Sequence, residues 1–182
     1  MNTKVIYVAG VPASGKTTLF KRIRERLFKE CKKFKEGKVR GIEQGCYKML
    51  GVFDDSTFEG TDRLSMTVID DAIEYINKLE RSSEKTVVFV EGDRLFNYRF
   101  LNHAKALVIL LDASPSVLAQ RHKERGDNQT NTFLKSRRTK VENFATKYHI
   151  GRAYNNTKED SERILQFIIK KAEQWVGECT TM

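Results

Sequence analysis

Hydrophobic and polar positions follow two different periods along this chain. Residues 5–9, 86–90 and 106–111 are almost continuously apolar, which is typical of strands buried on both faces of a sheet. Between these runs, apolar residues recur at three- and four-residue steps, as in helices with one buried face. The strongest such stretches are 19–34, 66–79 and 158–176. This alternation predicts an α/β protein.

The other expected elements have weaker signals, because their apolar runs are short or are interrupted by glycine. They are strands at 38–43, 47–53 and 152–156, helices at 96–104, from Ser114–Pro115 onward and at 133–148, and polar connections at 54–65 and 126–132. Short connections between alternating strands and helices favour one layered domain. We therefore expect residues 1–182 to form a single three-layer domain, with a mainly parallel five-stranded sheet between helices.

The stretch Gly10–Thr17 matches the pattern G-x-x-x-x-G-K-[ST], with a predicted strand before it and a predicted helix after it. In that context the loop turns several backbone N–H groups toward one point, where a polyphosphate binds at the helix N-terminus. Lys16 would reach the β- and γ-phosphates, and the Thr17 hydroxyl would bind Mg²⁺, so ATP and Mg²⁺ are the expected cofactors. The expected nucleotide contacts in this loop are Gly10, Ala13, Ser14, Gly15, Lys16, Thr17 and Thr18. The alternative is a glycine turn with a surface lysine.

Acidic residues follow the apolar run 86–90, in the order Glu91-Gly92-Asp93-Arg94. The carboxyl ends of parallel strands border the ligand crevice of a layered α/β protein. We expect Glu91 and Asp93 to hold Mg²⁺ or a water there, with Asp93 as a candidate general base, and Arg94 to contact the acceptor. Alternatively, these acids lie exposed in a capped loop.

A second polar pair, Asp62 and Arg63, lies in the loop before the helix at 66–79. Asp62 is placed to take a proton from an attacking hydroxyl, and Arg63 to bind an anion of the acceptor. The alternative is that Asp62 or Thr61 caps the following helix, since Asp and Thr are common cap residues.

The net charge of +9 is concentrated in two stretches. Residues 21–40 carry ten Lys or Arg against three Glu, and residues 115–147 carry eight against three acids. A basic surface favours polyanionic partners such as nucleotides or nucleic acid, although a solvated helix face is an alternative explanation. The three cysteines lack metal-ligand spacing, which favours reduced thiols. We expect a cytoplasmic protein without a signal peptide or a membrane partner; its oligomeric state is open.

Three motifs together resemble the P-loop nucleoside and nucleotide kinases over nearly the whole chain. They are Gly10–Thr17, Glu91–Asp93, and residues 111–115 leading to Arg121 and Arg125. The resemblance implies a P-loop NTPase fold with an arginine-bearing lid at about 121–140. It makes Arg121, Arg125, Arg137 and Arg138 candidates to contact the transferring phosphate. It also implies that residues 155–158 border the base, with Asn156 and Lys158 as nucleotide contacts.

The segment Phe58–Met66, preceded by residues 49–54, resembles phage-encoded P-loop kinases, some of which are similar to enzymes that phosphorylate 5-hydroxymethyluracil in DNA. The resemblance implies an acceptor-side insertion at about 37–65 and, for a phage protein, location in the host cell cytoplasm. The predicted reaction is transfer of the ATP γ-phosphate to a hydroxyl of a nucleotide-type acceptor, most specifically this modified base in duplex DNA. Alternatives are a kinase of a free nucleoside or nucleoside monophosphate, and a P-loop NTPase with a regulatory or nucleic-acid-binding role. The predicted catalytic residues are Lys16, Asp62, Asp93, Arg121, Arg125 and Arg138, and the predicted acceptor contacts are Asp62, Arg63, Glu91 and Arg94.

Overall fold

The computed structural model describes residues 1–54, 59–126 and 129–177. Within these residues, seven strands form one sheet in the order β2-β3-β4-β5-β1-β6-β7. The strands are β1 (Thr3–Gly10), β2 (Lys32–Glu36), β3 (Val39–Gln44), β4 (Tyr47–Leu50), β5 (Thr86–Glu91), β6 (Leu107–Asp112) and β7 (Arg152–Tyr154). The helices are α1 (Lys16–Leu27), α2 (Val68–Arg81), α3 (Tyr98–His103), α4 (Pro115–Glu124), α5 (Asn131–Tyr148) and α6 (Lys158–Gly177), with a short 3-10 turn η1 (Thr61–Arg63).

The five strands β4, β5, β1, β6 and β7 pair in parallel, and the antiparallel hairpin β2–β3 extends the sheet beyond β4. The expectation of five strands is therefore wrong. The prediction lacked β2, because it extended the first helix to Phe34, whereas α1 ends at Leu27. Phe34 instead lies in β2 opposite Gly41, and Gly37, with φ of +56°, turns the chain between β2 and β3.

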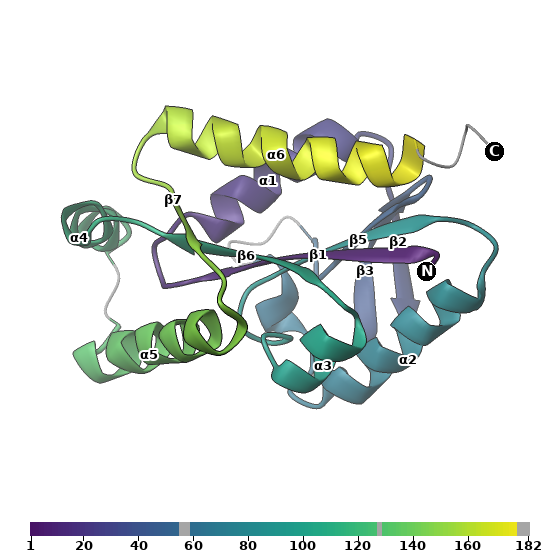
Figure 1. Cartoon of the computed structure of the whole chain (residues 1–182), viewed down its shortest axis with the longest axis horizontal. Coiled ribbons are helices and arrows are strands. Elements are labelled where there is room, and N and C mark those ends of the chain that lie inside the picture. The colour runs from purple at the N-terminus through teal and green to yellow at the C-terminus, as the bar shows by residue number, and fades with distance from the viewer. Residues whose placement is uncertain (55–58, 127–128, 178–182) are drawn as a thin grey trace.

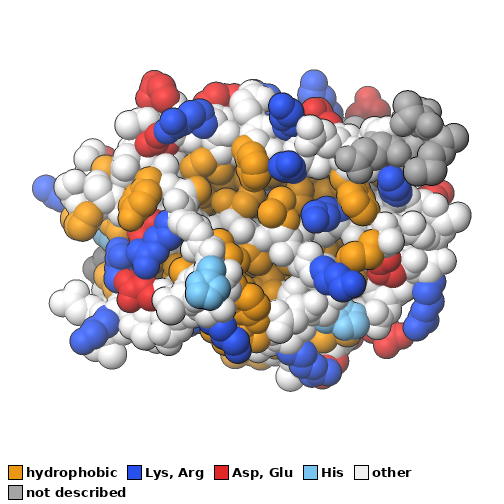
Figure 2. All heavy atoms as spheres, in the orientation of Figure 1, with side chains coloured by type: hydrophobic (Ala, Val, Ile, Leu, Met, Phe, Trp, Pro, Cys, Tyr) orange, Lys and Arg blue, Asp and Glu red, His pale blue; other side chains and the backbone are white. Residues whose placement is uncertain are grey.

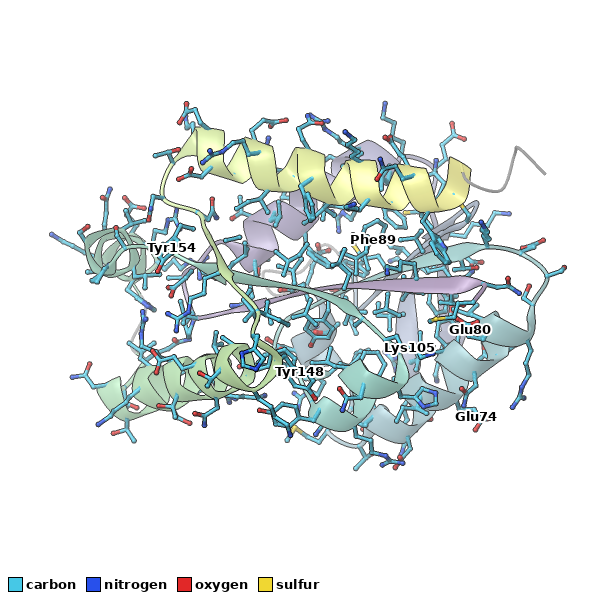
Figure 3. The ribbon with its side chains drawn as sticks, viewed as in Figure 1. Glu74, Glu80, Phe89, Lys105, Tyr148 and Tyr154 are labelled. Atoms are coloured by element: carbon cyan, nitrogen blue, oxygen red, sulfur yellow. The ribbon has the colours of Figure 1, made fainter. Side chains whose placement is uncertain are left out.

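The expected three layers are present. Helices α1 and α6 lie on one face of the sheet, and α2, α3 and α5 lie on the other (Figure 1). Alternate residues of β1 serve the two cores: Tyr7 packs on the α2, α3 and α5 side, and Val8 on the α1 and α6 side. Phe89 of β5 lies in the second core, close to the middle of the sheet (Figure 3).

The carboxyl ends of β1, β5 and β6 lie at one edge of the sheet because these strands are parallel. Gly10, Glu91 and Asp112 are their last residues. At Gly10, with φ of +153°, an added Cβ would lie 2.1 Å from the carbonyl oxygen of Leu111. Only glycine therefore allows β1 to turn into the next loop while it remains packed against β6.

β6 pairs with β1 along one edge, and β7 covers only part of its other edge. β7 pairs with Leu110–Asp112, and no other described strand continues the sheet beyond Leu107–Ile109. On this face, hydrophobic side chains gather in a band between α6 and α5, with lysines and arginines around it (Figure 2). Among the described helices, none combines the length and the apolar composition that a bilayer span requires.

Candidate active site

The loop between β1 and α1 folds back on itself through three residues with positive φ, Gly10, Ala13 and Gly15. Lys16, the first residue of α1, lies over this loop, and its Nζ donates to the carbonyl oxygens of Gly10 (2.9 Å) and Val11 (3.0 Å). Burial lowers the pKa of the Lys16 ammonium, while the nearby carboxylates of Glu91 and Asp93 act in the opposite direction. The loop thus has the shape and the charge of a P-loop.

A cavity of about 380 Å³ opens beside this loop, and we call it the donor cavity. Residues far apart in the sequence border it: Gly15, Thr18, Arg121, Glu124, Arg125, Asn155, Asn156, Thr157, Lys158 and Ser161. Six of the predicted nucleotide or phosphate contacts are among them: Gly15, Thr18, Arg121, Arg125, Asn156 and Lys158. The volume and the mixed polar lining suit the sugar and base of a nucleotide whose phosphates lie in the loop.

Asn155 connects three parts of the donor cavity. Its Nδ2 donates to the carbonyl oxygen of Ser14 (2.8 Å), its backbone N–H donates to that of Asp112 (2.9 Å), and its own carbonyl oxygen accepts from the Arg121 guanidinium (2.9 Å). A second nitrogen of Arg121 donates to the Ala13 carbonyl oxygen at 3.3 Å. Asn155 itself is buried. The P-loop, the arginine of α4 and the turn before α6 are therefore held together without a ligand.

The turn before α6 is stabilised by its own side chains. Thr157 accepts from the Asp160 backbone N–H (3.1 Å), and Asp160 accepts from the Thr157 backbone N–H (3.1 Å), which is the reciprocal arrangement of a capping box. Asn156 accepts from the backbone N–H of Ser114 through Oδ1 (2.7 Å). Lys158 follows as the first residue of α6 and lines the cavity.

Glu91 lies at the end of β5, across the P-loop from the donor cavity. Its exposed fraction is 5%. Burial, reinforced by the neighbouring Asp62 and Asp93 carboxylates, raises the pKa of Glu91 to about 7, although Lys16 favours the charged form. Gly60 leaves room for this carboxyl group, since an added Cβ there would lie 2.6 Å from Oε1 of Glu91.

Asp62 holds the turn that follows Glu91. Its Oδ1 accepts from the backbone N–H groups of Asp93 (2.9 Å) and Arg94 (3.1 Å), and the Arg94 guanidinium donates to the Asp62 carbonyl oxygen (2.7 Å). The suggestion that Asp62 or Thr61 caps the following helix is wrong, because both lie in η1 and α2 begins after Thr67. The structure thus brings the carboxylates of Asp62, Glu91 and Asp93 together, and we call this group the carboxylate cluster. Arg94 lies beside it.

Tyr7 is a site residue that the sequence did not reveal. Its buried hydroxyl donates to the carbonyl oxygen of Gly92 at 2.9 Å, in the turn that carries Glu91 and Asp93. Burial and the nearby carboxylates raise its pKa well above the usual value, so this hydroxyl stays protonated. A tyrosine within an apolar strand run looks like an ordinary core residue, and no sequence signal distinguishes this one.

The four arginines expected in a lid occupy two different places. Arg121 and Arg125 border the donor cavity. Arg137 and Arg138 lie on α5. Arg137 Nε is 3.2 Å from a carboxylate oxygen of Asp93, and Arg138 Nη1 is 3.6 Å from a carboxylate oxygen of the buried Asp112.

Each of these two acids has a second cationic partner. Lys140 Nζ lies 3.9 Å from a carboxylate oxygen of Asp93, and Arg152 Nη1 lies 2.9 Å from a carboxylate oxygen of Asp112. Arg63 forms an ion pair with the exposed Asp54. Of the predicted acceptor-side insertion, residues 55–58 lie outside the described residues.

Comparison with known proteins identifies the fold family. Residues 6–147 match the family model AAA_18, described as an AAA domain. The chain belongs to this family. The match runs from β1 into α5 and so includes the P-loop, the carboxylate cluster and the arginines of α4 and α5.

Two solved structures are similar to this AAA domain. Shikimate kinase from Bacteroides thetaiotaomicron has 14% identity and a TM-score of 0.40, and deoxyadenosine kinase from M. mycoides, bound to dCMP and dCDP as products, has 15% identity and a TM-score of 0.41. Both similarities cover 93% of this chain and 98% of the other. Curated protein sequences include no significant match.

The residues of the AAA domain fit a magnesium ion that is shared with a bound triphosphate. No group of three or more His, Cys, Asp or Glu among the described residues forms a cage for a metal. Mg²⁺ does not need one, because it usually binds one or two carboxylates together with substrate phosphates and water. Thr17, which is exposed, and Glu91, whose carboxyl group lies near Lys16 at the end of β5, are suitable ligands. Asp93 is less suitable because Arg137 and Lys140 already neutralise it.

Proposed function

We propose that this AAA domain is a phosphotransferase that moves the γ-phosphate of ATP to a hydroxyl group of a nucleotide-type acceptor. The observation that carries the proposal is that the site has two sides. The donor cavity lies on one side of the P-loop, and the Asp62–Glu91 carboxylate cluster lies on the other. Hydrolysis alone requires only the first side, whereas transfer requires a second place for the acceptor.

In this proposal, catalysis is mainly positioning and charge neutralisation, as for other phosphoryl transfers. Lys16 and the backbone N–H groups of the loop hold the β- and γ-phosphates, and Arg121 and Arg125 approach from α4. A magnesium ion held by Thr17 and Glu91 would offset phosphate charge. Asp62 uses Oδ1 to hold the turn, and its second oxygen would accept the proton of the attacking hydroxyl.

The finer proposal is that the acceptor is 5-hydroxymethyluracil in DNA. Its support is the resemblance of residues 58–66 to such kinases, together with the net charge of +9. Phe58 lies outside the described residues, while Gly60, Thr61 and Asp62 lie against Glu91 and Gly92. A free nucleoside or nucleoside monophosphate fits the same two-sided site equally well.

A second candidate function is a regulatory NTPase, which the AAA domain family description favours. Such a protein would need a group that orients the attacking water, or an arginine supplied by another copy. Arg121 and Arg125 of this same chain already border the donor cavity. That arrangement favours transfer within one chain over hydrolysis completed by a neighbour.

The test is transfer of labelled γ-phosphate from ATP with Mg²⁺ to parallel acceptors: free nucleosides, nucleoside monophosphates, plain DNA and DNA containing 5-hydroxymethyluracil. Lys16→Ala serves as the blank, and Lys21→Ala, an exposed lysine of the same helix, is the matched control. Label in the modified DNA alone establishes the finer proposal. Label in a small acceptor establishes the kinase and rejects the DNA base. Consumption of ATP with no labelled acceptor rejects the kinase in favour of the NTPase.

Asp62→Asn tests the acceptor side separately. The amide keeps an oxygen that can accept from the Asp93 and Arg94 N–H groups but cannot take a proton, so we expect kcat to fall about 100-fold with an unchanged KM for ATP. A fall in ATP affinity instead would show that Asp62 supports the donor cavity. An unchanged kcat would remove Asp62 from catalysis.

A further inference from the structure

A second groove, of about 470 Å³, lies on the outer hairpin of the sheet. Lys33 and Lys35 of β2, Arg40 of β3 and Phe53 are among the residues that line it. We call it the hairpin groove. It is separate from the donor cavity, with which it shares no lining residue.

Three cations in the hairpin groove have no acidic partner among the residues that the structure describes. Lys33, Lys35 and Arg40 are exposed, and none of them forms an ion pair with another residue in the described part of the chain. Other lysines nearby behave differently, since Lys38, Lys48 and Lys78 are paired with Asp71, Glu43 and Glu36, respectively.

Asp54 is the only acid among the described residues that line the groove, and it pairs with Arg63. The groove therefore presents uncompensated positive charge, and an anionic ligand is the complement.

The cations are spaced along an extended backbone. Lys33 and Lys35 occupy alternate positions of β2, so their side chains point to the same face of the sheet about 6.8 Å apart. Arg40 lies directly opposite Lys35 on β3. A row of charges of this kind matches a ligand with repeated phosphates better than a single phosphate group.

An aromatic side chain accompanies the charges. Phe53 is half-buried at the groove, and the Arg24 guanidinium lies 5.8 Å from its ring centre. Single nucleic-acid strands bind where a cationic track lies beside aromatic rings on which bases stack. An acidic peptide would use the charges but would have no use for a stacking surface.

The groove is aligned with the acceptor side of the active site. Lys35 of β2 lies opposite Arg40 of β3, and the Arg40 carbonyl oxygen accepts from the Gly51 backbone N–H. In the next pair of strands, Met49 of β4 lies opposite Phe89 of β5. Gly51 and Glu91 each follow two residues later. This places Gly51 level with Glu91. β2 and β5 are three strand spacings apart, which is about 14 Å, or a few nucleotides of an extended strand.

We propose that the hairpin groove binds the sugar-phosphate backbone of a single polynucleotide strand next to the acceptor nucleotide. This inference rests on the proposed function with a nucleic-acid acceptor. A base that receives a phosphate must leave the duplex stack to reach the P-loop. The strand in the groove is therefore single or locally opened.

The test is fluorescence anisotropy with a labelled single-stranded oligonucleotide of about 12 nucleotides. Binding is measured from about 50 to about 200 mM salt for the wild type, for Lys33→Ala/Lys35→Ala and for Lys170→Ala/Lys171→Ala. The control pair removes the same charge from exposed positions of α6. We expect the hairpin variant to bind about fivefold or more weakly, and the slope of log K against log salt to fall by about 1.4, because two phosphate contacts are lost. The control should bind like the wild type.

A second variant guards against misfolding of the hairpin. Arg40→Gln changes one exposed side chain on the neighbouring strand and should lower the salt slope by about 0.7. Equal losses in the hairpin and control variants would overturn the proposal, since they would show binding to net charge alone. Displacement of the oligonucleotide by polyglutamate of equal charge as readily as by unlabelled DNA would also overturn it, in favour of an acidic protein partner.

The outcome separates the groove from the kinase. If the wild type labels a small acceptor but does not bind the oligonucleotide, the groove proposal fails and the phosphotransferase stands. If the oligonucleotide binds through Lys33 and Lys35 but no acceptor is labelled, the groove stands and the proposed function fails.

Discussion

Glu91 should make the stability of the ligand-free protein depend on pH in a particular direction. Its pKa is raised from 4.5 to about 7 in the folded protein, mainly because the carboxyl group is buried. A raised carboxyl pKa stabilises the folded state fully below the unfolded pKa, and this stabilisation is lost as pH rises through the folded pKa. The stability contributed by Glu91 should therefore fall across the window from about pH 4.5 to about pH 7.

The size of the effect follows from these two values. Linkage gives a loss of about 2.5 kcal/mol between about pH 5 and about pH 8 for one group with this shift. For a protein of this length that corresponds to a change in Tm of about 5–10 °C. Glu91→Gln removes the titration and keeps a side chain of the same shape, so the variant lacks this loss.

The assay is thermal unfolding of the wild type and of Glu91→Gln at several pH values, without nucleotide or Mg²⁺. All other titrating groups are common to the two proteins, so the difference between their stabilities isolates Glu91. We expect the stability of Glu91→Gln relative to the wild type to increase steadily as pH rises. Parallel pH profiles would refute the reasoning, because Glu91 would then titrate alike in the folded and unfolded states.

Three further changes test the supports of the site. Gly10→Ala should destabilise the protein by about 3 kcal/mol or more, since the new Cβ would meet the Leu111 carbonyl oxygen and φ is positive; an unchanged Tm would contradict this close packing. Tyr7→Phe leaves the buried Gly92 carbonyl oxygen without its donor and should cost about 1–2 kcal/mol by denaturant unfolding, with a lower kcat; a loss of stability without a change in kcat would make Tyr7 a core residue only. Asn155→Ala should raise the KM for ATP and cost about 1–3 kcal/mol, and a KM like that of the wild type would show that the cavity does not need this link.

The donor half of the site could be predicted from the sequence because its signals are local. The Gly10–Thr17 pattern, the strand before it and the helix after it lie within one short stretch, and the structure has all three. The strand ending at Glu91 was also readable, since an apolar run followed by acids is a local pattern. The layered α/β architecture followed from the same alternation.

The remaining errors have physical causes. Residues 28–36 continue the apolar spacing of α1, so only the long-range pairing of Phe34 with Gly41 separates β2 from the helix. The role of Asp62 was ambiguous because a cap and a turn-holding carboxylate use the same residue type, and only the distance to the Asp93 and Arg94 N–H groups distinguishes them. Arg137 and Arg138 were expected beside Arg121 and Arg125, but they lie at Asp93 and Asp112 instead. These acids are distant in the sequence, so no local pattern reveals the contacts.

The hydrogen bonds of Asn155 have a consequence for how this protein can change over evolution. They tie the P-loop, Arg121 of α4 and the turn before α6 together, while the hairpin β2–β3 pairs with the rest of the sheet only through β4 among the described strands. An insertion or exchange in the hairpin alters no contact of the donor cavity. Sequence changes in the hairpin can therefore accumulate without disturbing the donor cavity.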